Sequence, residues 1–387
     1  MRYIGNKTKL LPFIGDVLAE TGITAGRALD AFAGTCAVGR YLKSLGFGVA
    51  TCDLMTYSYV LQRAYVVARG YPAFAGLCED LAFQRTRAHG AFTARVEARR
   101  TARRNGSGDG HAATRPLAEV LVYLDTELPP RASFMTEHFS ASPEIRDGER
   151  SYFSRENAMQ IDAIRHRIEE WSAEGLIDED EYFVLLAALI EAADAVANTT
   201  GIYAAFVKSW QPNARRALTL ALPQLTAGSG EPCDAHRGNI NELIDQLGHV
   251  DLLYLDPPYN TRQYSSYYHV PELIARGWFA SVPELRGKTG LIADAHLKSA
   301  WSTREGCVRA LADLIARADA DHVLMSYNSE GLIPETEIEA IFRAHGIGDT
   351  YRRTAREYAR YRSDSDSASR RYKADSVMEY LYYVQMR

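Results

Sequence analysis

The stretch Val250–His269, VDLLYLDPPYNTRQYSSYYH, decides the fold and the place of the candidate site. It opens with the apolar run LLYL, which is typical of a strand buried on both faces of a parallel sheet. Pro257 and Pro258 then end the strand, because a proline ring has no backbone N–H and fixes φ. Asp256, the two prolines and Tyr259 are therefore expected at the carboxyl end of a central strand, where open α/β sheets bind ligands.

A carboxylate beside an exposed aromatic ring suits a planar nitrogenous substrate. Asp256 can accept hydrogen bonds from an amino group, and Tyr259 can stack on the ring that carries this group. The alternative is a surface turn with a solvated aspartate, which Asp-Pro alone would indicate. The whole tetrapeptide after an apolar strand favours a binding site.

The composition is typical of a globular protein. The 387 residues are 47% hydrophobic and 24% charged, which allows a large core and two domains. We expect no membrane span, and the early charges Arg2, Lys7 and Lys9 argue against a signal peptide. Five scattered cysteines without a CxxC pair favour reduced thiols in the cytoplasm, with no disulfide and no metal site.

The net charge is −5, but basic residues are concentrated in two segments. Eight arginines lie between Arg85 and Arg115 against two acids, and eight Arg or Lys residues lie between Tyr351 and Lys373 against three acids. Basic segments on an acidic body are typical of a protein that binds a polyanion at one face. Solvated surface charge explains either segment alone equally well.

Residues Arg27–Gly39, RALDAFAGTCAVG, predict a strand, a turn of small residues and a helix. Small residues such as Ala33 and Gly34 let the backbone approach a ligand closely. A second strand, 48–52, ends at Asp53, where doubly wound folds hydrogen-bond a ribose. The competing interpretation is a nicotinamide-binding Rossmann site, but the turn reads GTCAVG instead of GxGxxG and no hydride-transfer site is evident.

The remaining periodicity predicts the other elements. An apolar helix follows the opening RYIGNK at 10–18, and further helices are expected at 154–171 behind an N-cap at Ser154, and at 180–196, 241–247, 306–317 and 335–345. A short strand and turn start at 233, a strand covers 322–327, and the tail 376–384 reads as an antiparallel edge strand. From 81 to about 150 the periodicity fades, which predicts a mobile insertion.

We therefore predict an α/β fold, a Rossmann-like sheet with an inserted, largely helical or irregular target-recognition region. The predicted catalytic domain comprises 1–80 and 233–387, and the insertion comprises 81–232, whose helical second half can pack on the core. Segment 198–210, NTTGIYAAFVKSW, is as consistent with a DNA-contacting loop and helix as with ordinary packing.

In family order, these motifs resemble the DNA adenine-N6 methyltransferases that use S-adenosylmethionine and whose cofactor motif precedes DPPY. The matching pieces are RYIGNK, DAFAG, Asp53, NTTGIYAAFVKSW, DPPYNTRQY, SYNSEGLI and EYLYYV, over about half of the chain. By motif position, the resemblance implies the cofactor-binding residues Tyr3, Lys7, Asp30, Phe32, Ala33, Gly34, Asp53, Asn239 and Asp256. Asn239 stands where relatives often carry Asp, and Cys36 replaces a common Gly. Asp256, Pro257, Pro258 and Tyr259 would be catalytic.

The chemistry of adenine explains this residue set. The N6 lone pair is delocalised into the ring, so the amine is a poor nucleophile. Accepting its two hydrogens with the Asp256 carboxylate and the Pro257 carbonyl would localise that pair, and a sulfonium supplies an activated methyl group. A cytosine-C5 enzyme would need a cysteine nucleophile, often after Pro, but Pro232-Cys233 precedes a different strand from DPPY.

The target base lies inside duplex DNA, so it must be flipped out, and Tyr259 is the expected stacking surface. The residues expected to contact DNA are Arg99, Arg100, Arg103, Arg104, Lys208, Arg262 and Tyr264. A separate restriction endonuclease would be a genetic partner. The alternatives are methylation of RNA or of another exocyclic amine, and a non-catalytic DNA-binding protein with the same fold. Asp at the first position of DPPY favours adenine in DNA, and Asp53 and Asp256 favour catalysis.

Overall fold

The computed structural model describes residues 1–101, 113–359 and 376–387, which form two compact units. The sheet unit comprises residues 3–62, 226–267 and 294–387. The helical unit comprises residues 1–2, 63–225 and 268–293. No helix in the described ranges combines the length and apolarity that a membrane span requires.

The sheet unit contains a seven-stranded sheet in the order β10-β11-β9-β6-β1-β2-β5. The strands are β1 (Arg27–Asp30), β2 (Gly48–Asp53), β5 (Asp234–Arg237), β6 (Val250–Leu255), β9 (Ala320–Asn328), β10 (Arg352–Ala359) and β11 (Ser376–Gln385). The pairings from β5 to β9 are parallel, and those of β11 with β9 and β10 are antiparallel. The sequence prediction of an α/β sheet with the Asp256 strand at its centre is confirmed.

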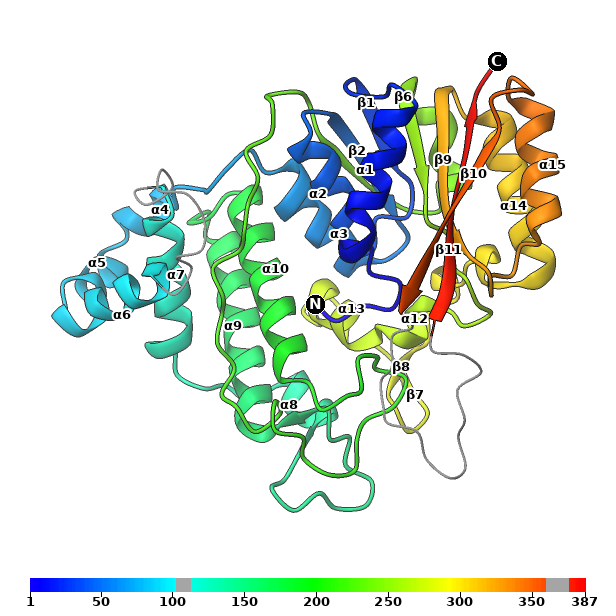
Figure 1. The fold of residues 1–387 in the computed structure, drawn as a ribbon. Coiled ribbons are helices and arrows are strands. Elements are labelled where there is room, and N and C mark those ends of the chain that lie inside the picture. The colour runs from blue at the N-terminus through cyan, green and yellow to red at the C-terminus, as the bar shows by residue number, and fades with distance from the viewer. Residues whose placement is uncertain (102–112, 360–375) are drawn as a thin grey trace. The chain divides into compact units, whose positions relative to one another are not determined.

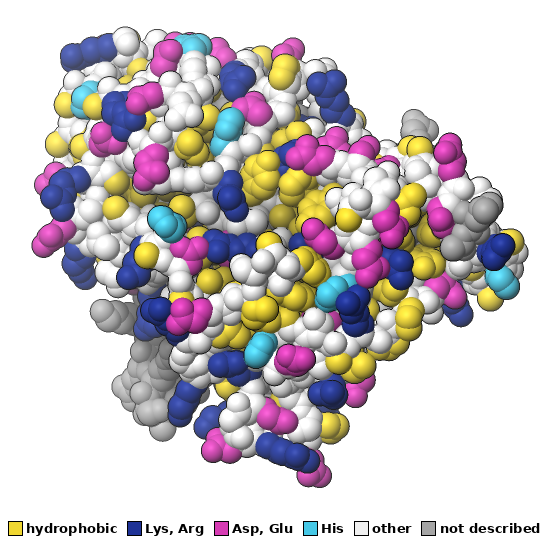
Figure 2. Space-filling model, turned by 180° about the vertical axis from the view of Figure 1, so that it is seen from behind, with side chains coloured by type: hydrophobic (Ala, Val, Ile, Leu, Met, Phe, Trp, Pro, Cys, Tyr) yellow, Lys and Arg dark blue, Asp and Glu magenta, His cyan; other side chains and the backbone are white. Residues whose placement is uncertain are grey.

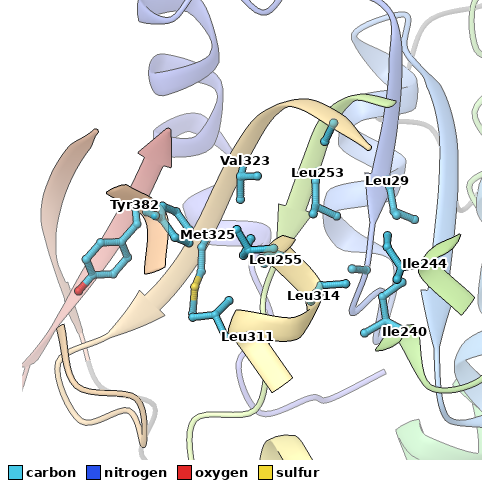
Figure 3. Close-up of a cluster of buried hydrophobic side chains, with 14 of the residues drawn as sticks. Leu29, Ile240, Ile244, Leu253, Leu255, Leu311, Leu314, Val323, Met325 and Tyr382 are labelled. Atoms are coloured by element: carbon cyan, nitrogen blue, oxygen red, sulfur yellow. The ribbon is translucent and has the colours of Figure 1, made fainter. Parts of the chain in front are cut away.

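Helices cover both faces of this sheet, with α1 and α2 on one side and α14 and α15 on the other (Figure 1). The helices of the unit are α1 (Leu11–Glu20), α2 (Ala37–Ser44), α3 (Thr56–Gln62), α11 (Ile240–Leu243), α12 (Tyr264–Tyr267), α14 (Arg304–Arg317) and α15 (Glu335–His345). Leu253 and Leu255 of β6 belong to one buried cluster with Leu311 and Leu314 of α14 (Figure 3). Burial on both faces explains the continuous apolar run of β6.

The sheet reverses its strand order between β1 and β6. The chain runs from β1 to β2 on one side and from β6 to β9 on the other, and β1 pairs with β6 so that Asp30 lies opposite Tyr254. Ligands of open α/β sheets bind outside the carboxyl ends of the strands at such a point. The register therefore places the segments after Asp30 and Leu255 at the same edge.

The helical unit consists of α4 (Ala75–Glu79), α5 (Leu81–Arg87), α6 (Gly90–Thr101), α7 (Arg115–Thr126), α8 (Phe134–Phe139), α9 (Arg155–Ala173), α10 (Glu179–Val196) and α13 (His269–Arg276). It also contains a π-helix, η2 (Arg63–Val67), and the two-residue strand pairs β3 (Ser140–Ala141) with β4 (Phe153–Ser154) and β7 (Leu285–Arg286) with β8 (Leu291–Ile292). The predicted N-cap of α9 is confirmed, since the Ser154 side chain accepts from Asn157 N at 3.2 Å.

The segment from 81 to about 150, predicted as a mobile insertion, contains the helices α5, α6, α7 and α8 in its described part. Half of the residues of α6 are exposed, and Phe92 and Val96 pack on Ala118 and Val122 of α7. A stripe of two apolar side chains is too weak a periodic signal to predict a helix from sequence. Segment 198–210, by contrast, forms turns and loop and contains no helix.

The prediction for the tail of the chain needs correction. The tail strand β11 is antiparallel, as predicted, but it lies inside the sheet and not at its edge. The edge strand is β10, which belongs to the basic segment after Tyr351.

The boundaries between the two compact units fall at 62/63 and 225/226, and residues 268–293 belong to the helical unit. Residues 268–293 belong to the helical unit because α13 is buried in it. Arg165 Nε of this unit donates to the Ile274 carbonyl at 2.9 Å.

Candidate active site

Asp256 follows β6 directly and is the centre of a cluster of polar side chains in the sheet unit. Tyr259 Oη donates a hydrogen bond to Asp256 Oδ1 at 2.6 Å, and Lys7 Nζ lies 3.2 Å from the same oxygen. Lys7 also donates to Tyr259 Oη, and its ammonium lies 4.6 Å from the centre of the Tyr259 ring. The three side chains thus share one hydrogen-bonded arrangement.

Lys7 reaches this position from the opening turn of the chain. Gly5 adopts φ +80°, which a glycine accepts without steric cost, and the chain then enters the short 3-10 helix Thr8–Leu10 ahead of α1. The Lys7 side chain is 4% exposed, so its charge requires buried counter-charges. Asp256 provides one, and Glu379 of β11 provides another, with Oε2 3.9 Å from Lys7 Nζ.

Burial sets the acidity of these groups. It raises the pKa of Asp256, and the Lys7 charge and the Tyr259 hydrogen bond oppose this rise. Burial also raises the pKa of Tyr259 well above its ordinary value, with the Asp256 charge acting in the same direction. Tyr259 therefore remains a neutral hydrogen-bond donor to the carboxylate at physiological pH.

The last residue of β1 supplies a second carboxylate, which is buried. Asp30 Oδ2 accepts from Gly39 N of α2 at 3.0 Å, while Oδ1 is buried without a hydrogen-bond partner among the described residues. Burial, and next the charge of Asp256, raise the pKa of Asp30 to about 7. An unsatisfied buried oxygen beside a hollow indicates a position for a donor from a ligand.

That hollow gathers seven of the predicted cofactor residues. Its lining includes Tyr3, Lys7, Asp30, Phe32, Ala33, Gly34 and Asp256. Gly34 adopts φ +51°, and a Cβ at this position would lie 2.9 Å from a Tyr3 ring carbon. Glycine at 34 therefore allows the Tyr3 ring to close over the turn.

Asp53 has a structural role that the sequence reasoning missed. Its Oδ2 accepts from Gly34 N at 2.9 Å and its Oδ1 accepts from Met55 N at 2.9 Å, so it fixes the turn after β1 to the end of β2. Asn239 is not part of the hollow's lining. It caps α11, with its side chain accepting from Asn241 N at 3.2 Å, and the preceding Gly238 N donates to the Asp53 carbonyl at 2.9 Å.

Cys36 occupies the left-handed region at φ +60°, immediately before α2. This conformation costs a residue with a side chain roughly 1–2 kcal/mol and costs glycine little. The backbone therefore explains why glycine suits this position.

Tyr259 differs from the expected exposed ring. It is half-buried, its edge-to-face contact with Tyr327 has a centroid distance of 4.9 Å, and its hydroxyl is engaged with Asp256 and Lys7. The contacts of the Tyr259 hydroxyl could not be recognised from the sequence, because the position of Lys7 depends on tertiary structure. Glu379 was also missed as a site residue, although a lone acid in the apolar run EYLYYV was the signal available.

The residues predicted to contact DNA fall into three groups. Arg262 and Lys208 are exposed, and Tyr264 is half-buried with its ring 5.7 Å from that of Tyr3. Arg99 and Arg100 of α6 are mostly buried and pair with Asp125 at 2.5 Å and Glu97 at 2.7 Å, respectively. Arg103 and Arg104 lie outside the described residues. Among the described residues in Figure 2, Lys and Arg side chains are interspersed with Asp and Glu.

Comparison with known proteins adds an independent observation. Residues 3–340 match the family model described as D12 class N6 adenine-specific DNA methyltransferase. The chain is 34% identical over 391 residues to the type II methyltransferase M.NlaIII of Neisseria lactamica, covering 100% of this chain and 99% of the relative. It is also 34% identical over 390 residues to the type II methyltransferase M.FokI of Planomicrobium okeanokoites, with coverage of 100% and 52%. The type II methyltransferase M.CviAII of Paramecium bursaria Chlorella virus 1 is 26% identical over 385 residues, with coverage of 99% and 97%.

The buried Asp30 predicts a pH dependence of stability. Its carboxyl ionises near pH 4 in the unfolded chain and at about pH 7 in the folded chain, so the folded state binds more protons between these values and loses stability as pH rises. The loss is on the order of 4 kcal/mol. Asp30→Asn can keep an acceptor for Gly39 N without the charge, so its stability relative to the unmodified protein should increase from pH 5 to pH 8. Urea unfolding at both values measures this, and parallel pH profiles for the two proteins would contradict the assignment.

Proposed function

The chain belongs to the D12 class N6 adenine-specific DNA methyltransferases, and on this premise we propose that it takes the methyl group from S-adenosylmethionine and that the acceptor adenine is turned out of duplex DNA. The observation that carries the proposal is the pair of acceptors at the end of β6. No described residue donates a hydrogen bond to Asp256 Oδ2 or to the Pro257 carbonyl oxygen. An exocyclic amine has two N–H groups and requires two such acceptors.

The residues at the end of β1 fit the proposed methyl donor. S-adenosylmethionine supplies a sulfonium-activated methyl group when bound, and it carries positive charge that a buried carboxylate can balance. Asp30 provides such a carboxylate with one unsatisfied oxygen, and Gly34 provides a close backbone approach under Tyr3. Asp53, at the tip of β2, would accept from the ribose through the remaining lone pairs of its oxygens. Phe32 and Asn239 would contact the adenosine part.

Asp256 and the Pro257 carbonyl would orient the acceptor amine and localise its lone pair. The Lys7 charge opposes the rise that burial causes in the pKa of Asp256. It therefore favours the ionised form, whose two oxygens accept hydrogen bonds. The Tyr259 hydroxyl fixes Oδ1, so that Oδ2 remains for the substrate. Holding the reacting groups in this way supplies orientation and electrostatic stabilisation without a covalent intermediate.

Stacking of the flipped base is the proposed role of the Tyr259 ring, on the part of its surface that Lys7 and Tyr327 leave open. Arg262 and Tyr264 follow DPPY within a few residues and would contact the DNA around the extruded nucleotide. Since M.NlaIII and M.FokI are type II methyltransferases, we propose a modification role with a restriction endonuclease as the genetic partner.

We predict that Asp256→Ala lowers methyl transfer by roughly three orders of magnitude, because the charged acceptor for the amine is lost. The measurement is incorporation of labelled methyl groups from S-adenosylmethionine into DNA from cells that lack the protein, and thermal unfolding checks that the variant folds. Asp321→Asn is the matched control, since Asp321 is exposed at the opposite end of the same sheet. Near-normal turnover of Asp256→Ala would refute the proposed function.

Two variants separate the ring of Tyr259 from its hydroxyl. Tyr259→Phe removes the hydrogen bond to Asp256 but keeps the stacking surface, and we expect a loss within about tenfold. Tyr259→Ala should lose a further one to two orders of magnitude, since stacking contributes about 1–3 kcal/mol per base. Fluorescence of 2-aminopurine at the mapped target position should rise on binding for the Phe variant and rise less for the Ala variant. Equal turnover of both variants would show that the ring does not hold the base.

The arginines offer a test of DNA contacts. Arg262→Gln should flatten the dependence of log affinity on log salt by about 0.9, the contribution of one phosphate contact, with little change in thermal stability. If Arg99 and Arg100 also contact phosphate, the double Gln variant should flatten the slope further. An unchanged slope with a lowered melting temperature would instead show that the two arginines serve only to neutralise Asp125 and Glu97.

A further inference from the structure

We propose that Glu379 is a positioning residue for methyl transfer, because its carboxylate holds the Lys7 ammonium that lies against Asp256. The proposal rests on the proposed function of Asp256 and extends it to a residue on a different strand. Lys7 Nζ lies 3.2 Å from Asp256 Oδ1 and 3.9 Å from Glu379 Oε2, so a single cation lies within ion-pairing distance of both acids.

Burial makes this contact significant. The Glu379 side chain is 7% exposed, and its Oε2 has no hydrogen-bond partner among the described residues. The Asn328 side chain hydrogen-bonds to the Glu379 carboxyl group from the paired position on β9. A nearby cation stabilises the ionised form of a buried carboxylate that has one unsatisfied oxygen, and Lys7 opposes the rise that burial causes in the pKa of Glu379.

The neighbouring strand does not supply that cation. Arg356 of β10 is paired with Glu379 in the sheet register, but its guanidinium binds Asp16 at 3.0 Å and lies over the Phe13 ring at 4.3 Å. The neutralisation of Glu379 therefore depends on Lys7. Conversely, Glu379 shares the Lys7 ammonium with Asp256, so the Lys7 charge does not stabilise Asp256 alone.

The consequence for catalysis follows from charge. Lys7 stabilises the ionised form of Asp256, whereas a second acid on Lys7 keeps Asp256 more basic and its oxygens less tightly held. A carboxylate of this kind accepts more strongly from an amine whose lone pair has to be localised. The charged and titratable groups that face Asp256 in the described structure are Lys7, Asp30, Tyr254, Tyr259, Tyr327 and Glu379.

The first test is the pH profile of single-turnover methylation of DNA by the full chain. Glu379→Gln removes a negative charge near Asp256, so the acidic limb should move to lower pH by roughly 0.5–1 unit and the plateau rate should fall about tenfold. Glu379→Asp keeps the charge and should retain the unmodified limb. Glu337→Gln, which removes an exposed charge of α15, should change neither quantity. An unmoved limb in Glu379→Gln, or the same shift in Glu379→Asp, would overturn the proposal.

The second test does not depend on activity. Lys7→Met leaves two buried acids without their cation and should lower the melting temperature, and adding Glu379→Gln should restore part of the loss. Additive losses in the double variant would show that Glu379 does not bind Lys7 and would overturn the proposal. If Asp256→Ala keeps its turnover, the proposed function fails as well. If Asp256→Ala is inactive while Glu379→Gln keeps the original profile, only the role of Glu379 fails.

Discussion

The parallel pairing of β1 with β6 is the constraint on which the site depends. It brings the turn after Asp30 and the DPPY segment after Leu255 to the same edge of the sheet, where the Asp30 carboxylate is buried and that of Asp256 is largely buried. Two buried acids at one edge are tolerated only if a proton or a cation compensates them. The structure uses both solutions, since burial and Asp256 raise the pKa of Asp30 to about 7, and Lys7 lies against Asp256. The opening turn of the chain must therefore dock at a strand about 250 residues away in sequence.

The elements that flank the site could be predicted because their sequences carry strong local signals. The run LLYL is apolar on both faces because β6 is buried on both faces, and Ser154 marks the start of α9 because its side chain satisfies a helix N–H. β10 carries no such signal. Its charged residues are paired with β11, and only this pairing makes it a strand. Hydrophobic periodicity in a sequence reflects burial, so it does not reveal a strand at an exposed edge or a helix on an exposed surface.

The members of the site could be predicted more fully than their contacts. Motif residues gather at the carboxyl ends of β1 and β6 because topology requires it, and this much follows from the order of strands and turns. The direction of a hydroxyl does not follow. Tyr259 donates to Asp256 in an arrangement that Lys7 completes, and Lys7 is buried against Glu379 from a strand near the end of the chain. Those contacts join three distant segments, and no local pattern encodes them.

The charges at this edge would link the binding of the proposed methyl donor to the ionisation of Asp256. Burial raises the pKa values of the three acids Asp30, Asp256 and Glu379, and Lys7 lies close to two of them. A positively charged ligand beside Asp30 would favour the ionised forms of the neighbouring acids by the same electrostatic interaction that binds it. By linkage, ionisation of Asp256 then strengthens the binding of that ligand in equal measure. In the proposed function, Asp256 would therefore accept the amine most strongly when the cationic donor is bound, and the binding of the two substrates would be mutually reinforcing.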